Sequence, residues 1–234
     1  MAQFTVTGDV DPFLHVSLAN GEKIYCESNA MVMMEDTLEL KGKMTGGLGS
    51  ALMRRLANDE SFFQQHIEAV RGDGDCLLSP TLPGAIQVLD VGEISYMISD
   101  GAFVAAEFGV NLNVRTQGVG SSLFGQTGGF FICEASGRGK LAVSGFGSSF
   151  VLDVEPGKDM IIDNAHVVAW DNRLHHEISV TTQQGGGLLG QLVNSVTSGE
   201  GMVLKFSGKG KVVICSRNRE NFLSWLLKGM PANR

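Results

Sequence analysis

The sequence predicts an all-β protein made of three tandem β-sandwich repeats, with a short helix at the C-terminus. One signal is a Gly-Xaa-Gly turn between apolar runs, which is typical of a hairpin with a tight turn. It recurs with a period of about 70 residues, and a fixed period is the signature of repeated units. The three copies are R-G-D-G-D-C-L-L-S (71–79), S-G-R-G-K-L-A-V-S (136–144) and S-G-K-G-K-V-V-I-C (207–215).

A second signal lies upstream of each hairpin and keeps the same period. It occupies 25–35, 97–107 and 160–170, and the copies align at Ala30, Ala102 and Ala165. The chain has 31 glycines and only five prolines, as expected for many tight turns between hydrogen-bonded strands. We therefore predict one compact unit over 1–234 with a pseudo-threefold relation among its repeats. The expected segments are repeats at about 13–85, 86–148 and 149–216, then a helix at 217–229.

Each repeat is expected to begin with two strands joined by a glycine-containing turn. These turns fall at 20–21, within 88–93 and within 151–158. The next turn uses residues that tolerate positive φ or fold their side chains onto the backbone. Its copies are Ser28-Asn29, Asp100-Gly101 and Asp163-Asn164.

The run after this second turn is apolar without alternation. Its copies are 30–34, 102–106 and 165–170. A strand of this kind needs cover on both faces, whereas a half-buried strand alternates apolar and polar residues. Because a second cover often comes from another subunit, we predict a homo-oligomer.

The middle of each repeat is a glycine-rich loop, at 46–49, 118–129 and 185–187. Apolar residues spaced by three and four predict a short amphipathic helix after the first and third loops. A final helix is predicted before Gly229, with Asn218 as its N-cap. It could pack on its own sheet or on a neighbour.

The composition argues against several classes of protein. A formal net charge of −7 disfavours nucleic-acid binding, which needs a basic face. The four cysteines are widely spaced within apolar runs, so we expect buried thiols and neither disulfides nor a metal site. No secretory leader and no apolar run of about 18 residues occurs, which predicts a soluble cytoplasmic protein.

Motifs for cofactor or metal chemistry are weak. Residues 120–127 have the spacing of a phosphate-binding loop, but Gln126 stands where the lysine should be. His175-His176-Glu177 lacks metal-ligand spacing, because adjacent residues of a strand point to opposite faces. His166 takes a packing or subunit-contact position. We predict no metal, no cofactor and no catalytic residue.

Charged positions do not match between repeats. The hairpin tips carry Asp73, Arg138 and Lys209, whose signs differ, so they are interpreted as solvated turns. Glu35 and Glu107 align with each other, and Trp170 is expected in the third place. Arg54 and Arg55 form the best local anion patch, and their role stays open.

Four further segments are informative: S-N-A-M-V-M-M-E (28–35), M-T-G-G-L-G (44–49), S-F-F (61–63) and D-N-A-H-V-V-A-W (163–170). Through them the chain resembles the bacterial and archaeal family related to the yeast altered-inheritance-of-mitochondria protein. The resemblance implies small β-sandwich, double-stranded-helix-like units similar in fold to the tryptophan-attenuation protein, fused in one chain and assembled as a trimer or ring. It implies no catalytic residues. The mitochondrial relatives take part in inner-membrane organisation, and membrane association is left open here.

These observations favour a non-enzymatic, oligomeric β protein that acts as a scaffold or interaction module. One alternative is a sensor that binds an amino-acid-like ligand between repeats, by analogy with the tryptophan-binding ring. A metal-dependent or hydrolytic enzyme is the third alternative. It needs a polar cluster that the sequence does not display.

Overall fold

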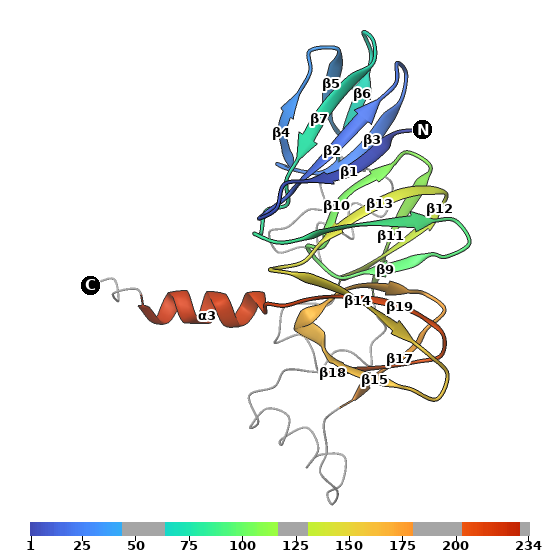
Figure 1. Cartoon of the computed structure of the whole chain (residues 1–234), viewed down its shortest axis with the longest axis vertical. Helices are drawn as coiled ribbons and strands as arrows, with labels where there is room; N and C mark the ends of the chain where they lie inside the picture. The colour runs from blue at the N-terminus through green and yellow to red at the C-terminus, as the bar shows by residue number, and fades with distance from the viewer. Residues whose placement is uncertain (44–63, 117–130, 180–202, 230–234) are drawn as a thin grey trace, which may run out of the picture.

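The computed structural model describes residues 1–43, 64–116, 131–179 and 203–229. The predicted glycine loops, their helices, residues 120–127 and the Arg54-Arg55 pair lie outside these ranges. The described chain forms four antiparallel sheets and one short C-terminal helix, which confirms the all-β class and the helix. Three sets of strands are stacked along the long axis, and the helix extends sideways from them (Figure 1).

The strands fall into three sets of six, preceded by one additional strand, β1 (Gln3–Thr7). The first set is β2 (Phe13–Leu18), β3 (Lys23–Glu27), β4 (Met31–Met34), β5 (Leu38–Lys43), β6 (Gln64–Ala69) and β7 (Gly74–Leu78). The second is β8 (Ile86–Val91), β9 (Tyr96–Ile98), β10 (Phe103–Glu107), β11 (Val110–Thr116), β12 (Phe131–Gly137) and β13 (Gly139–Ser144). The third is β14 (Ser149–Val154), β15 (Met160–Asp163), β16 (Val167–Asp171), β17 (His175–Ser179), β18 (Val203–Ser207) and β19 (Gly210–Cys215).

The same pairing scheme occurs in each set. In the first set β7 pairs with β2 and β4, and β6 pairs with β5 and β3. The second set repeats this with β13 and β12, and the third with β19 and β18. A bulge interrupts the register at one position of each scheme, at Met31/Met33, Phe103/Ala105 and Val167/Ala169. The pseudo-threefold relation and the repeat boundaries stay predictions.

Neighbouring sets are joined by strand pairs that extend the sheets. β3 pairs with β10, and β9 pairs with β16, both antiparallel. The two central sheets therefore have six strands each, in the orders β5-β6-β3-β10-β13-β8 and β11-β12-β9-β16-β19-β14. The two end sheets are shorter, with the orders β1-β2-β7-β4 and β15-β18-β17.

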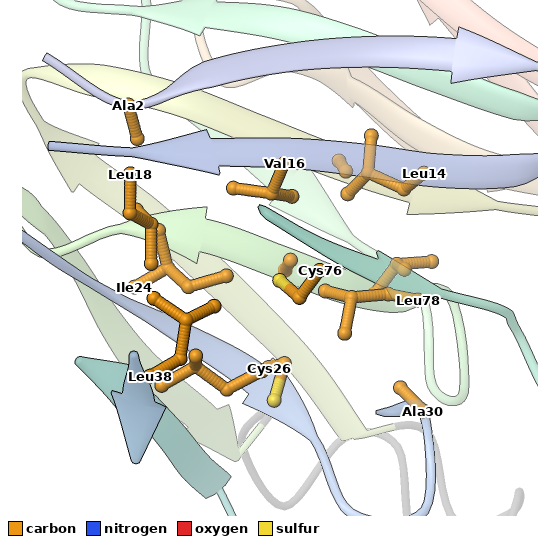
Figure 2. Close-up of a cluster of buried hydrophobic side chains, with 14 of the residues drawn as sticks. Ala2, Leu14, Val16, Leu18, Ile24, Cys26, Ala30, Leu38, Cys76 and Leu78 are labelled. Atoms are coloured by element: carbon orange, nitrogen blue, oxygen red, sulfur yellow. The ribbon is translucent and has the colours of Figure 1, made fainter. Parts of the chain in front are cut away.

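The hydrophobic core continues across both junctions. One cluster joins Ile24, Cys26 and Leu78 of the first set to Val104 and Ala105 of the second. Figure 2 shows its side chains meeting between the strands of the first set. A second cluster joins the second set to the third, and a third cluster lies within the third set around Trp170 and Phe206. Burial of this apolar surface is the main force that holds the stack together.

The alignment of the third upstream signal was wrong by one residue. A 3₁₀ turn, η2 (Asn164–His166), adds a residue between the second turn and β16. Ala30 and Ala102 are buried and accept from the backbone N–H of Ser79 and Ser144, whereas Ala165 is half-buried. In the third set His166 directly precedes the strand instead, and its ring Nδ1 lies 2.8 Å from the Cys215 carbonyl oxygen.

The acidic position of the third set is corrected by the same shift. Met34, Ala106 and Trp170 hold the same place relative to their hairpins. Trp170 therefore does not replace the third acid. The acids that follow these residues are Glu35, Glu107 and Asp171.

Candidate interaction surfaces

The acid at this position accepts a hydrogen bond from a backbone N–H of the Gly-Xaa-Gly hairpin in the first two sets. Glu35 Oε2 accepts from the backbone N–H of Asp75 at 3.1 Å, and Glu107 Oε2 accepts from that of Lys140 at 2.7 Å. In the third set Asp171 is only 1% exposed. The carboxylates of Glu35 and Glu107 satisfy backbone donors next to the hairpin turn, which is a structural role.

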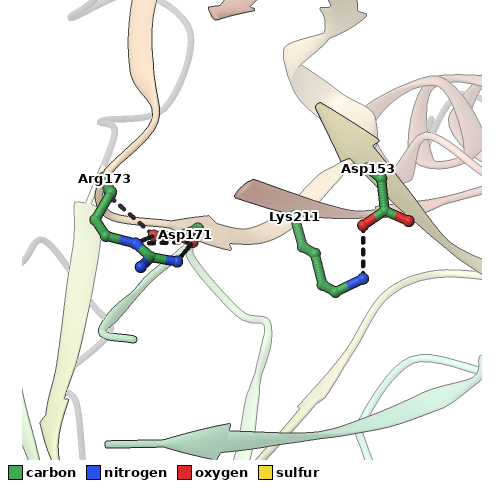
Figure 3. Close-up of polar contacts among 4 residues, drawn as sticks. All are labelled: Asp153, Asp171, Arg173 and Lys211. Atoms are coloured by element: carbon green, nitrogen blue, oxygen red, sulfur yellow. Dashed lines mark hydrogen bonds and ion pairs between the residues drawn. The ribbon is translucent and has the colours of Figure 1, made fainter. Parts of the chain in front are cut away.

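Asp171 is held by its neighbour Arg173. Its Oδ1 accepts from the Arg173 backbone N–H at 3.0 Å, and its Oδ2 accepts from the guanidinium at 2.6 Å (Figure 3). The nearby pair Asp153–Lys211 has a similar distance of 2.6 Å but lies in solvent. The paired geometry around Asp171 leaves its carboxylate occupied, so it is not free for chemistry.

The two adjacent histidines lie on opposite sides of β17, as the strand geometry predicted. His175 Nε2 is 2.9 Å from Glu177 Oε1 on the exposed side. His176 is half-buried and packs edge-on against Trp170, with ring centroids 5.4 Å apart. Burial, and to a lesser degree the neighbouring His175, lowers the pKa of His176. His175 therefore faces solvent, whereas His176 packs against the core.

The other candidate residues from the sequence lie in packing positions or in solvent. His166 Nδ1 donates to the Cys215 carbonyl at 2.8 Å, which agrees with its predicted packing position. The hairpin tips Asp73, Arg138 and Lys209 are exposed, as predicted. Within the described ranges, no group of three or more histidine, cysteine or acidic residues is placed to hold a metal ion.

The cysteines are free thiols in the interior. Burial raises the pKa of Cys26, Cys76 and Cys133 to about 12, and raises that of Cys215 as well. A thiol reacts as its thiolate, so these groups are unreactive near neutral pH.

Several large apolar side chains of the described surface are uncovered. They gather first on helix α3 (Arg219–Gly229), where no residue is buried. Asn218 Oδ1 accepts from the Asn221 N–H at 3.0 Å, which confirms the predicted cap. Phe222 contacts Phe146 at the base of the helix, with ring centroids 5.1 Å apart. We call the apolar side of α3 the helix face; it consists of Phe222, Leu223, Trp225, Leu226 and Leu227.

The helix face is uncovered along most of its length. Trp225 is 68% exposed, and Leu227 is exposed to nearly the same degree. At 100° per residue the five apolar side chains cover a broad arc, and Glu220, Ser224 and Lys228 lie on the other side. A helix with this pattern normally buries its apolar stripe against another element. Sequence reasoning had left open whether α3 packs on its own sheet.

The second uncovered region consists of two strand edges. β4 and β15 each end a sheet, at opposite ends of the stack (Figure 1). Val32 and Met33 on β4 are exposed, and Ile161 on β15 is 58% exposed. We call these the β4 edge and the β15 edge. An open apolar strand edge is a template for pairing with another chain.

The fold and these surfaces define a class of protein: a stack of antiparallel β modules with uncovered apolar edges and a projecting helix. Residues 4–217 match the family model described as mitochondrial biogenesis AIM24. The chain therefore belongs to the AIM24 family, which confirms the resemblance seen in the sequence.

Two relatives extend this comparison. An uncharacterized protein of Streptococcus pyogenes serotype M6 is 33% identical over 238 residues, covering 99% of this chain and 92% of that protein. A crystal structure of a protein from Streptococcus pyogenes, determined by a structural genomics consortium, is 31% identical with a TM-score of 0.78. The match covers 98% of this chain and 100% of that one. No helix in the described part of the chain is long and apolar enough to cross a membrane.

Proposed function

We propose that this protein is a non-enzymatic scaffold that works as a homo-oligomer, a trimer or a ring, and contacts neighbouring chains through its helix face and strand edges. The observation that carries the proposal is α3, a helix whose apolar side is left exposed by its own chain along most of its length. Large exposed apolar patches with polar surroundings are typical of protein interaction sites. Tandem β modules with a pseudo-threefold relation supply a rigid frame for such sites.

The polar groups support a binding role more than a catalytic one. The best-placed carboxylates, Glu107 and Asp171, are occupied by backbone and guanidinium donors. His176 is packed against aromatic rings, and the thiols are buried. A catalytic site needs groups with free hydrogen-bonding capacity near one another. The groups named here are engaged in holding turns and cores.

Native mass spectrometry and light scattering of the full chain test the proposal. A scaffold of this type gives a mass that is a multiple of 25.0 kDa at micromolar concentration. A mass of 25.0 kDa under these conditions would contradict it. The same spectrum tests the small-ligand alternative, because a retained amino-acid-like molecule would add its own mass. Stoichiometric zinc or iron in the purified protein would favour the enzyme alternative.

A pair of variants tests the helix face. Trp225→Ser with Leu227→Ser removes two exposed apolar side chains, so the fold of the single chain should be unchanged. If neighbouring chains cover α3, the oligomer should dissociate at a higher protein concentration than the wild type. Val10→Ser is the matched control, because Val10 is an exposed apolar residue in a turn outside both surfaces. Equal behaviour of the double variant and the control would exclude α3 from the assembly.

A further inference from the structure

We propose that the β15 edge of one copy pairs, antiparallel, with the β4 edge of the next copy, and that this pairing builds the oligomer. The inference rests on the proposed function, because it names the surfaces through which the homo-oligomer forms. It assigns a second copy of this chain as the partner of both strand edges.

The sheet orders give the first argument. In each central sheet, the first three strands come from one set and the last three from the next, as in β5-β6-β3 followed by β10-β13-β8. The end sheets contain the two halves of one more sheet of this kind. Strands β17-β18-β15 correspond to the first half, and β4-β7-β2 to the second. Joining β15 to β4 would complete the missing six-stranded sheet.

The two existing junctions predict the register. At the first junction Ala105 lies opposite Cys26, and Ala106 lies opposite Tyr25. At the second, Ala169 lies opposite Ile98, and Trp170 opposite Met97. The bulges identify Met33 and Met34 as the β4 counterparts, and the pairing of β15 with β18 identifies Ile162 and Ile161 on β15. The pairs between copies are therefore Met33 with Ile162 and Met34 with Ile161.

The bulge residues supply a specific hydrogen bond. At the second junction, the Ser99 N–H donates to the carbonyl of the bulge residue Val168 at 2.9 Å. Asp163 holds the place of Ser99 on β15, and Val32 holds the place of Val168 on β4. The Asp163 N–H of one copy is thus expected to donate to the Val32 carbonyl of the next.

Burial at the three bulge positions gives an independent argument. Val104 and Val168 are 1% and 2% exposed, because each lies at a junction between sets. Val32 occupies the same place at the free end and is 54% exposed. The same residue type is thus kept where no neighbour covers it within the chain. A second copy that presents β15 would cover Val32 as β3 and β9 cover its counterparts.

The chain cannot close this sheet on itself, because β4 and β15 lie at opposite ends of the stack (Figure 1). The pairing joins two different surfaces, so the interface is heterologous. Heterologous interfaces produce a closed ring when the rotation between subunits closes, and a filament when it does not. A ring is the form expected for a discrete oligomer.

Cysteine cross-linking tests the register. Opposite residues of an antiparallel pair have Cα atoms about 4.5 to 5.5 Å apart, within the range that a disulfide spans. Met34→Cys combined with Ile161→Cys should therefore give a ladder of covalent multimers on a non-reducing gel after mild oxidation. The native thiols do not compete, since they are buried with raised pKa values.

The single variants Met34→Cys and Ile161→Cys are the controls. Neither edge pairs with itself in a heterologous interface, so each alone should remain uncross-linked. A ladder from the double variant alone supports the proposal. A dimer from either single variant would instead indicate like edges in contact and would overturn it. Absence of cross-links in a double variant that is still oligomeric would also overturn it.

A charge at the edge provides a test that does not depend on oxidation. Ile161→Lys places a cation on an exposed residue, so the single chain should fold, and the dissociation constant should rise at least tenfold. Phe150→Lys is the matched control, because Phe150 is similarly exposed on β14, away from both edges. A wild-type monomer would contradict the proposed function itself. An oligomer that tolerates Ile161→Lys would contradict the edge pairing alone.

Discussion

Removal of the Asp171 carboxylate should destabilise the third strand set. Asp171→Ala deletes the acceptors for the Arg173 backbone N–H at 3.0 Å and for its guanidinium at 2.6 Å. Hydrogen bonds to charged groups contribute about 1.5 to 3 kcal/mol each. Arg173 is 56% exposed, so water replaces part of what its guanidinium loses, whereas the part-buried backbone donor is left without its carboxylate. We therefore expect the free energy of unfolding to fall by about 2 kcal/mol.

Urea unfolding followed by circular dichroism measures this change, with Asp153→Ala as the matched control. Asp153 also pairs with a cation at 2.6 Å, but both side chains of that pair are more than half exposed (Figure 3). Exposed ion pairs contribute about 0 to 1 kcal/mol, so the control should lose less than about 0.5 kcal/mol. Equal losses in the two variants would show that burial of Asp171 has no energetic role, and would refute the reasoning.

Three further predictions follow from burial and backbone geometry. Gly139→Ala should lower the free energy of unfolding, followed by thermal unfolding, by more than about 1 kcal/mol, because Gly139 has a φ of +147° and a Cβ there would lie 2.7 Å from Glu107 Oε2. Gly92→Ala is the control and should be tolerated, because a Cβ at Gly92 would meet no atom within 4 Å. Val104→Ala should cost about 2 kcal/mol in urea unfolding, whereas Val32→Ala should leave the single chain nearly unchanged and weaken the oligomer. The pKa of His176 is lowered in the folded chain, so below the ordinary histidine pKa near 6.5 the unfolded chain binds more protons than the folded one. The free energy of unfolding should therefore fall as the pH drops through 6.5. His176→Phe should remove this pH dependence in urea unfolding measured from pH 5 to pH 8.

The repeated hairpins could be predicted from the sequence, because short stretches of residues determine them. Gly-Xaa-Gly turns have positive φ at Gly72, Gly137 and Gly208, a need that few residues other than glycine meet. The continuous apolar runs also predicted strands covered on both faces, and β10 and β16 are buried throughout. These features depend on short-range backbone geometry and on local burial, so they can be seen in one sequence.

The remaining features depend on contacts distant in the chain. The 3₁₀ turn at Asn164–His166 shifts the third set by one residue, and spacing alone did not show this shift. Asp171 was therefore missed as the third member of the acidic position. The sequence does contain a pattern that points to Asp171, because an acidic residue follows the apolar run in every set. Asp171 can be matched to Glu35 and Glu107 only once the bulge fixes the register of β16. The solvent-exposed position of α3 likewise depends on tertiary packing that its own residues do not specify.

The composition of the edge strands shows why β4 is best explained by a missing neighbour. Most outer strands of the described sheets carry charges, as β5 does with Glu39 and Lys41, β14 with Asp153 and β8 with Asp90. Charged edges prevent unwanted pairing between sheets. β4 reads M-V-M-M and has no charge, and the first three residues of β15 are also apolar. A chain that protects most of its other edges in this way but leaves these two largely apolar has the pattern expected of strands that the proposed assembly buries.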